Sequence, residues 1–583
     1  MGVGLFRVFA GMFRFLRPKC CRDMLPVLHY AYGAVLLLYL LFSSLYVGSL
    51  LHVGFFLVVR RVSYYVVVGG GEYSIAMITA VCALILLSPA LWRRGSRPAR
   101  IAIGIVPLSA VLMLCLPLST VSLVAGFAAL VLPSIYLLSS YVHVYKGFTW
   151  CWFGVVLVSA VLTALRVLGL VHTVPEFTVV DYLFGMLQRF SPYLVLFLMA
   201  SAIVVVATSI LKHRSGYLEE EGKTDEKKLL MCSALLSSLL YIVPYTTAVN
   251  PRRMVATTDI LVYVELLEKM RMGEDLLGSA LSLRYGDRFL YLLLLYSIQK
   301  LTGVDSWTIS TISGWVWAPL LTVSVWYMVK RFYGATVAIH TALLTSFSAQ
   351  LLGFIYGGFQ ANHLNLAVLF FSAGLLSEKS LYKKVAGALL FFASPGIHAW
   401  SYLHVAPSLT MWATVELIRR RDRESATRLV VLLSALLASI LTIVSLTGSL
   451  EYILSLLEKW VVRLAFSKSI TDKLAGLSLA LSIYVWGSLN SPVLYLASIG
   501  GQALRLVKRN TTEHAPLDYL MLLTLVGVLA LSPDIDLVSR LILNTPLHVL
   551  AGFLLANSSR ETKVLLYSSA AYVSMYLVLN APP

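Results

Sequence analysis

The stretch that decides the fold reads LLMCSALLSSLLYIVPYTT (229–247) and continues AVNPRRMVATTDILVYVELLEKM (248–270). The first part is an apolar run of roughly the 20 residues that a helix needs to cross a bilayer. The second part carries two arginines, a lone aspartate (Asp259), and an amphipathic stretch with Glu265 and Glu268. A polar cluster directly after a span predicts a site at one surface of a membrane.

Apolar residues dominate the whole chain. Of its 583 residues, 59% are hydrophobic and only 13% are charged, and the mean hydropathy is +0.83. A soluble protein cannot bury so much apolar surface, so the composition predicts an all-α, polytopic integral membrane protein. The net charge of +18 fits the excess of Lys and Arg in cytoplasmic loops, and no nucleic-acid-binding motif accompanies it. We therefore expect the bilayer, and no nucleic acid, as a partner. The six cysteines show no metal-ligand spacing.

The apolar runs predict about 17 transmembrane helices. They cover residues 26–47, 74–92, 101–117, 119–144, 151–170, 191–211, 229–247, 306–329, 335–354, 361–376, 384–397, 401–418, 427–447, 476–503, 516–532, 540–557 and 563–580.

Five basic clusters test this arrangement, because Lys and Arg are enriched in cytoplasmic loops. With a cytoplasmic N-terminus, all of them face the cytoplasm: 93–100, 212–228, 377–384, 419–428 and 505–509. The same arrangement makes the apolar segment 288–301 a juxtamembrane helix on the outer surface. Four polar clusters then share the outer face, at 248–288, 357–363, 394–400 and 532–540.

The charged segment 212–228 divides the chain and is expected to be a cytoplasmic linker. Before it lies an N-terminal membrane module of about six helices, residues 1–211. After it lies a transmembrane core, residues 229–583, with an outer loop at 248–305. All four polar outer clusters belong to this core.

The first outer cluster offers charged side chains with two interpretations each. Asp259 begins an amphipathic stretch, so it suits a helix cap and a general base equally well. Arg252 and Arg253 lie at the outer interface, where basic residues are disfavoured; a bound lipid phosphate or simple snorkelling explains them. Glu265 and Glu268 are expected to be an exposed polar face of the helix.

The clusters at 357–363 and 394–400 add uncharged polar groups. Gln360, Asn362 and His363 open a span, where a network between helices and contact with a ligand are equally suitable roles. The Pro-Gly pair of SPGIHAW (394–400) is expected to break the apolar run and to turn His398 and Trp400 outward.

The last outer cluster gathers Asp534, Asp536 and Arg540 in a tight turn. Asp536 and Arg540 are four residues apart, so an internal salt bridge is one interpretation and phosphate binding by Arg540 is the other. The chain has no Walker loop, Rossmann glycine motif or zinc-protease motif, which disfavours an ATP-driven pump.

The order of these segments resembles the GT-C superfamily of membrane glycosyltransferases, which includes protein O-mannosyltransferases and oligosaccharyltransferase catalytic subunits. TTDILVYVELLEKMRMGED (257–275) resembles the first-loop pattern, and YGDRFLYLLLLYSIQKLTGVDSW (285–307) resembles the juxtamembrane segment, with Phe289 where proline is common. IYGGFQANHLNLAVLFFSAGLL (355–376) and SPGIHAWSYL (394–403) resemble mid-chain elements of archaeal members. DIDLVSRLILNTPLHVLAGF (534–553) resembles the late Arg-and-Pro segment.

The resemblance implies a GT-C-like core and an inverting transfer of a sugar from a polyprenyl (dolichyl)-phosphate carrier to a protein, lipid or glycan acceptor. Asp259 would be the catalytic base. The donor phosphate would be bound by Arg252, Arg253, Arg288 and Arg540. The sugar or acceptor pocket would contain Gln360, Asn362, His363, His398, Asp534 and Asp536.

The resemblance also implies a plasma-membrane protein with an extracytoplasmic active site. The chain carries one acidic residue, Asp259, where the family has an adjacent acidic pair. The sequence therefore indicates no cofactor and leaves a divalent metal as an open alternative. Two other functions compete with the transferase: a transporter or flippase for a polyprenyl-linked lipid, and a non-catalytic membrane scaffold derived from a GT-C enzyme.

Overall fold

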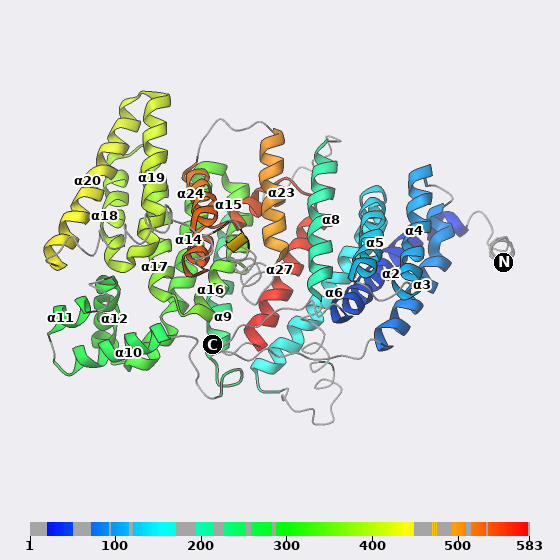
Figure 1. Cartoon of the computed structure of the whole chain (residues 1–583), viewed down its shortest axis with the longest axis horizontal. Helices are drawn as coiled ribbons and strands as arrows, with labels where there is room; N and C mark the ends of the chain where they lie inside the picture. The colour runs from blue at the N-terminus through cyan, green and yellow to red at the C-terminus, as the bar shows by residue number, and fades with distance from the viewer. Residues whose placement is uncertain are drawn as a thin grey trace.

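The computed structural model describes residues 20–50, 71–92, 95–115, 120–170, 183, 194–214, 225–251, 258–273, 275–282, 287–447, 469, 471–472, 474, 492–508, 515–531 and 535–580. Within these residues every regular element is a helix, and no strand occurs. The all-α fold is therefore confirmed for the described part. Figure 1 shows the helices side by side along the long axis of the molecule, with α2–α5 at one end and α18–α20 at the other.

The described helices of the N-terminal module each overlap one predicted apolar run. They are α2 (Cys20–Leu50), α3 (Gly71–Trp92), α4 (Arg97–Cys115), α5 (Thr120–Ser140), α6 (Val142–Val167) and α8 (Val195–Arg214). The largest boundary difference is in α6, which begins at Val142 rather than at residue 151. Its first turns, VHVYKGFTW, contain polar residues that a hydropathy pattern excludes but a helix accepts.

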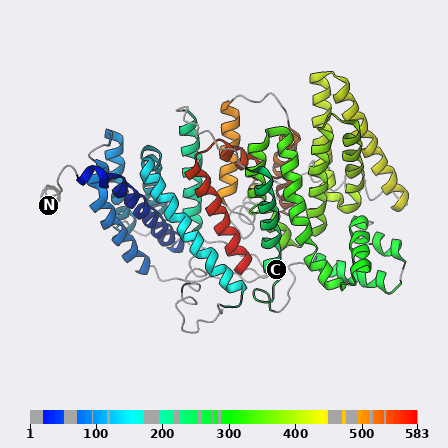
Figure 2. The ribbon, with the colours of Figure 1, turned by 180° about the vertical axis from the view of Figure 1, so that it is seen from behind.

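A group of short helices follows the span α9 (Glu226–Ile242) and its 3-10 turn η3 (Val243–Tyr245). The group consists of α10 (Thr258–Arg271), α11 (Leu276–Leu281), α12 (Phe289–Thr302) and α13 (Ser306–Ile312). Asp275 and Asp305 cap α11 and α13 by accepting hydrogen bonds from backbone N–H groups. Figures 1 and 2 show α10–α12 together beneath the lower ends of α17–α20. The segment 288–301 is thus a helix within a group set apart from the long helices.

The remaining helices form what we call the C-terminal bundle. It comprises α14 (Gly314–Tyr333), α15 (Ala335–Thr345), α16 (Ala349–Gly357), α17 (Gln360–Leu376), α18 (Leu381–Ile397), α19 (Ala399–Arg420), α20 (Arg423–Thr447), α23 (Pro492–Lys508), α24 (Pro516–Leu531), α25 (Ile535–Asn544), α26 (His548–Ala556) and α27 (Arg560–Asn580).

Two predicted single spans, 335–354 and 540–557, are each broken into two helices. Ser348 accepts a hydrogen bond from the backbone N–H of Leu351 and so starts α16 as a new helix. Pro546 lies in the link between α25 and α26, where it cannot donate a helical hydrogen bond. Both breaks occur within apolar runs, so hydropathy alone does not reveal them.

In the described part of the chain, six helical stretches are long and apolar enough to cross a membrane: Met24–Gly48, Val142–Val167, Glu226–Tyr245, Ser306–Tyr333, Ala335–Ile355 and Arg423–Leu446. Several such helices in one chain indicate a multi-pass membrane protein. In Arg423–Leu446 only 17% of the apolar stretch is buried within the protein. Most of that stretch can therefore contact hydrocarbon.

Ion pairs, most of them at least partly buried, gather at the helix ends remote from α10–α12. The pairs are Lys330–Glu226, Arg331–Glu378, Lys384–Glu424, Arg428–Glu416 and Arg505–Asp518. The guanidinium of Arg505 also lies over the ring of Tyr333 at the end of α14. The basic clusters around 330, 384, 420 and 505 therefore meet at one end of the bundle, as a common side of the membrane requires.

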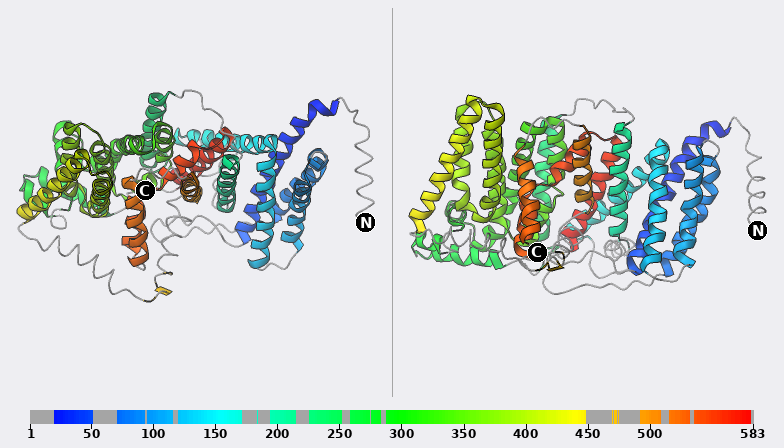
Figure 3. Two further views of the ribbon diagram at one scale, coloured as in Figure 1. Left: turned by 90° about the horizontal axis from the view of Figure 1, so that it is seen from above. Right: turned by 45° about the horizontal axis from the view of Figure 1, so that its top comes forward.

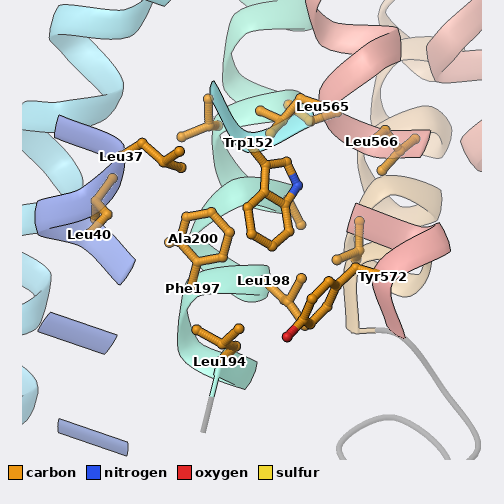
Figure 4. Close-up of a cluster of buried hydrophobic side chains, with 14 of the residues drawn as sticks. Leu37, Leu40, Trp152, Leu194, Phe197, Leu198, Ala200, Leu565, Leu566 and Tyr572 are labelled. Atoms are coloured by element: carbon orange, nitrogen blue, oxygen red, sulfur yellow. The ribbon is translucent and has the colours of Figure 1, made fainter. Parts of the chain in front are cut away.

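One continuous apolar core joins the N-terminal helices to the C-terminal bundle. Figure 4 shows Trp152 of α6 between Phe197 of α8 and Tyr572 of α27. The indole N–H of Trp152 donates to the hydroxyl of Ser569 at 3.1 Å, and this buried hydrogen bond fixes α6 against α27. Seen from above in Figure 3, the terminal helices α27 and α23 lie between the two ends of the molecule.

Candidate functional site

Asp259 and Arg288, named separately from the sequence, form an ion pair. Asp259 lies in the first turn of α10, where a carboxylate is favoured by the helix dipole. Arg288 directly precedes α12. Its Nη1 donates to Oδ2 of Asp259 at 3.0 Å. The pair therefore ties the beginning of α10 to the beginning of α12.

The guanidinium of Arg288 is almost fully buried, with 3% of its side chain exposed. Its Nη1 also donates to the hydroxyl of Tyr263 at 2.6 Å, and its Nε lies 3.7 Å from Oδ2 of Asp287. Burial opposes the charge of Arg288, but Tyr263, Asp287 and Asp259 outweigh it and raise its pKa above the usual range. Burial raises the pKa of Tyr263 as well, so the phenol stays neutral.

Asp287 connects this pair to the bundle. Its Oδ1 accepts a hydrogen bond of 2.8 Å from the backbone N–H of Ala399, the first residue of α19. A buried carboxylate at a helix N-terminus is favoured by the unpaired N–H groups there. The position of Arg288, and through it that of Asp259, is therefore coupled to the junction between α18 and α19.

Gln360 is the centre of a buried hydrogen-bond network between helices. Its Oε1 accepts from the hydroxyls of Tyr291 (3.0 Å) and Ser313 (2.6 Å). Its Nε2 donates to the hydroxyl of Tyr241 and to the backbone carbonyl of Thr311, both at 3.1 Å. Every hydrogen-bonding group of the amide is satisfied within the protein, which matches the network interpretation of Gln360 rather than contact with a ligand.

Asn362 and His363 lie inside α17 and are buried. Asn362 donates to Oδ1 of Asn544 at 2.9 Å, which links α17 to α25. The imidazole of His363 is completely buried and stacks on Phe354, with the ring centroids 4.3 Å apart. Neither of its nitrogens has a hydrogen-bond partner. The segment 357–363, expected as a polar cluster at the outer mouth of a span, is mostly the start of a buried helix, interrupted only at Gly358 and Phe359.

The prediction for 394–400 is corrected by the structure. α18 continues through Pro395 and Gly396 to Ile397, and the chain breaks only at His398. Both His398 and Trp400 are buried, at 3% and 8% exposure, instead of facing outward. The physical reason is that the imidazole of His398 caps α19: its Nδ1 accepts from the backbone N–H of Ser401 at 3.2 Å.

Arg540 lies on α25 with its guanidinium over the ring of Trp400, 5.7 Å from the centroid. Arg540 is only partly buried. Four of the predicted site side chains lie outside the described side chains: Arg252, Arg253, Asp534 and Asp536. The expected salt bridge between Asp536 and Arg540 is therefore neither seen nor contradicted.

Glu265 and Glu268 differ from each other, although the sequence predicts one solvated face for both. Glu265 forms an exposed pair with Lys269 at 2.8 Å. Glu268 accepts from the hydroxyl of Ser306 and pairs with Arg271, so it ties α10 to the beginning of α13. The hydrogen bond from Ser306 and the pairing with Arg271 lower the pKa of Glu268. The interpretation of Glu268 as a merely solvated residue is wrong.

Two members of the site were not predicted: Tyr263 and Asp287. Tyr263 follows Asp259 by four residues, so the helical spacing could have placed both on one face of α10. Asp287 adjoins Arg288, but its contact with Ala399 across 112 residues has no local signal. Among the described residues, no three His, Cys, Asp or Glu side chains gather closely enough to hold a metal ion.

One carboxylate oxygen of Asp259 accepts a hydrogen bond from the buried guanidinium of Arg288. Asp259 keeps 19% of its side chain exposed, so this side chain is only partly covered by the described residues. No known family model matches this chain, and no characterised protein shows significant sequence similarity to it.

Proposed function

We propose that the chain is an inverting membrane glycosyltransferase. It takes a sugar from a polyprenyl-phosphate carrier and passes it to an extracytoplasmic protein, lipid or glycan acceptor. The proposal includes a GT-C-like core of about 17 spans in the plasma membrane, with the N-terminus in the cytoplasm and α10–α13 on the outer side.

The observation that carries the proposal is the pair of Asp259 and Arg288. A partly exposed carboxylate stands at the surface of a group of short helices, and a buried arginine holds it in place. General-base catalysis needs a carboxylate in a fixed orientation within reach of an acceptor hydroxyl. The ordered resemblance of five segments between 257 and 553 to GT-C enzymes supports the same chemistry.

In the proposed step, the acceptor oxygen bonds to the anomeric carbon while the bond from that carbon to the phosphate oxygen breaks. The hydroxyl proton passes to Asp259, and the phosphate leaves with the bonding electrons. Phosphate is a good leaving group, so it needs neutralising cations rather than an acid.

Arg288 takes a different role from the one first expected. With 3% exposure and three partners on its guanidinium, it acts as a positioning residue for Asp259 rather than as a phosphate ligand. Arg540, beside Trp400, and the pair Arg252 and Arg253 are the cations that we assign to the phosphate.

The test uses the purified full chain in liposomes that contain radiolabelled polyprenyl-phosphate sugars. Release of free polyprenyl phosphate is measured with water or added acceptor alcohols. Asp259→Asn keeps the size of the side chain but cannot take a proton, so turnover should fall by about 100-fold or more. Glu265→Gln, on the exposed face of the same helix, is the matched control and should keep normal turnover.

Near-normal turnover in Asp259→Asn would contradict the assignment of Asp259 as the catalytic base. A wild-type chain that folds and binds polyprenyl phosphate, yet never cleaves any donor of the panel, would instead favour the non-catalytic scaffold.

A second candidate, a transporter of polyprenyl-linked lipids, is favoured by one set of observations. His363, His404 and His548 are buried within the bundle, and the breaks at 346–348 and 545–547 interrupt two spans. Buried ionisable groups and broken helices are typical of transporters. Movement of a fluorescent polyprenyl phosphate between the leaflets of proteoliposomes, without cleavage, would support this candidate over the transferase.

A further inference from the structure

A cavity of about 950 Å³ lies among α23, α24 and the link between α25 and α26. Its walls are almost entirely apolar, and α23 contributes one helical face that includes Tyr495, Ile499 and Leu506. Tyr495 and Leu506 are eleven positions apart, which in a helix is a rise of about 16 Å, roughly half of the hydrocarbon core of a bilayer. Ile499, Leu506 and Leu525 of the lining are exposed, so the cavity opens on the outside of the bundle, where hydrocarbon surrounds a membrane protein.

A small polar pocket adjoins the deep side of this cavity. It is lined by Gln350, Ser498, Thr545 and His548, and it shares Tyr495, Ser498, Ile542 and Leu547 with the large cavity. The free space is about 10 Å³, which holds one water molecule or one hydroxyl group. The two spaces together form a long, mainly apolar cavity with a small polar pocket beside it.

The polar pocket lacks one hydrogen-bond donor. Gln350 is 2% exposed, and its Nε2 donates to the backbone carbonyl of Leu543 at 2.8 Å. Its Oε1 is buried and has no partner. The hydroxyls of Ser498 and Thr545 donate to backbone carbonyls, so neither supplies the missing proton. A buried acceptor without a donor is costly, so the pocket favours a guest that brings an O–H group.

The charges along the cavity exclude an anionic head group. Among the described residues of the lining, Arg505 is the only cation, and both of its terminal nitrogens donate to the carboxylate of Asp518. Together the two side chains are neutral. A neutral amphiphile fits this lining better than a lipid phosphate does.

We propose that this cavity binds a lipid alcohol, with its apolar chain along α23 and α24 and its hydroxyl donating to Oε1 of Gln350. The site is separate from Asp259 and Arg288 and does not depend on the proposed transferase activity.

The experiment uses the full chain in lipid nanodiscs and three probes: farnesol carrying a diazirine on its apolar chain, the methyl ether of that probe, and its monophosphate. Labelled peptides are identified by mass spectrometry. Labelling of α23 and α24 by the alcohol should be saturable. Its half-saturating concentration should be about tenfold lower than that of the ether, which has no proton to donate.

Gln350→Leu should abolish the preference for the alcohol over the ether. Gln299→Leu is the matched control, because Gln299 is also buried with an unpaired Oε1 but lies on α12, away from the cavity. Leu525→Trp needs no change of the core, since Leu525 is 58% exposed. It should block labelling by filling the cavity mouth, even if Gln350→Leu fails to fold.

Four results would overturn the proposal. Equal binding of alcohol and ether would mean that only water occupies the polar pocket. Tighter binding of the monophosphate would contradict the neutral head group. Loss of the preference in Gln502→Leu alone would place the hydroxyl at the other unpaired glutamine of the cavity. No saturable labelling at all would mean that another occupant, such as residues between α20 and α23, fills the groove.

Discussion

At the residue scale, Arg288 is the cation that holds the candidate site together. The carboxylates of Asp259 and Asp287 and the phenol of Tyr263 all contact its buried guanidinium. The guanidinium therefore compensates part of the free-energy cost of removing each of these groups from water. Removal of one partner of a buried ion pair leaves the other charges unpaired, which costs far more than the intact pair contributes.

Arg288→Met keeps the length of the side chain but removes its charge. We expect a loss of about 3–5 kcal/mol in the free energy of unfolding, because Asp287 remains buried without its cation. Thermal unfolding of the purified protein in detergent measures the change. Lys269→Met, which breaks the exposed pair with Glu265, is the control and should cost no more than about 1 kcal/mol. Equal small shifts in both variants would contradict the buried ion pair.

Glu268 gives a pH dependence. The hydrogen bond from Ser306 and the pairing with Arg271 lower its pKa in the folded state below the ordinary 4.5. Its contribution to stability is therefore fully present above pH 4.5 and is lost as the pH falls through the lowered pKa. The protection of the α13 amides against hydrogen exchange, measured relative to the intrinsic exchange rate at each pH, should fall over this acidic range. Glu268→Gln should flatten the response, and an unchanged acid response in that variant would refute the assignment.

The sequence predicted several residues of the site but not the contacts between them. Asp259 and Arg288 both follow from the polar segments after a span, but they are 29 residues apart and belong to different helices. Their meeting depends on how α10, α11 and α12 turn back on one another, and no local pattern encodes that. His398 was expected to face outward because Pro395-Gly396 suggested a break; the helix instead continues through both residues to Ile397, and the imidazole becomes a buried cap.

At the scale of elements, the spans were predictable because a long apolar run has few stable alternatives to a membrane helix. The breaks inside 335–354 and 540–557 were not, since Ser348 and Pro546 interrupt the backbone without lowering the hydropathy of the run. Close approach of helices is set by small residues. Gly147 of α6 faces the backbone of Tyr30 in α2, and Gly33 of α2 faces the backbone of Val144 in α6.

Gly147→Ala should therefore push α2 and α6 apart. A methyl group there would collide with the backbone carbonyl of Tyr30, which cannot rotate away. We expect destabilisation by about 1–3 kcal/mol, measured by thermal unfolding. Gly154→Ala is the control on the same helix, because nothing lies within 4 Å of its new methyl group. It should be neutral or stabilise the helix by up to about 1 kcal/mol. The reverse order of the two variants would disprove the packing of α2 against α6.

At the scale of the whole molecule, the N-terminal helices and the C-terminal bundle share one core. Besides Trp152 and Ser569, the hydroxyl of Tyr145 donates to Thr562 at 3.1 Å, and Ser209 and Ser558 are 2.7 Å apart. The charged linker suggested two modules from the sequence, but buried hydrogen bonds across their junction are expected to make them unfold together.

Trp152→Ala tests this coupling. The indole is completely buried between α6, α8 and α27, so its removal should cost about 3–5 kcal/mol through lost contacts and the cavity left behind. If the two parts form one cooperative unit, hydrogen exchange should accelerate in α27 and α23 as well as in α6, and thermal unfolding should remain a single transition at lower temperature. Leu157→Ala, five residues away on the same helix and 53% exposed, should leave both unchanged. The contrary result is faster exchange in the N-terminal helices alone, together with a second unfolding transition at the original temperature. It would show that the C-terminal bundle folds independently and that the linker separates two domains.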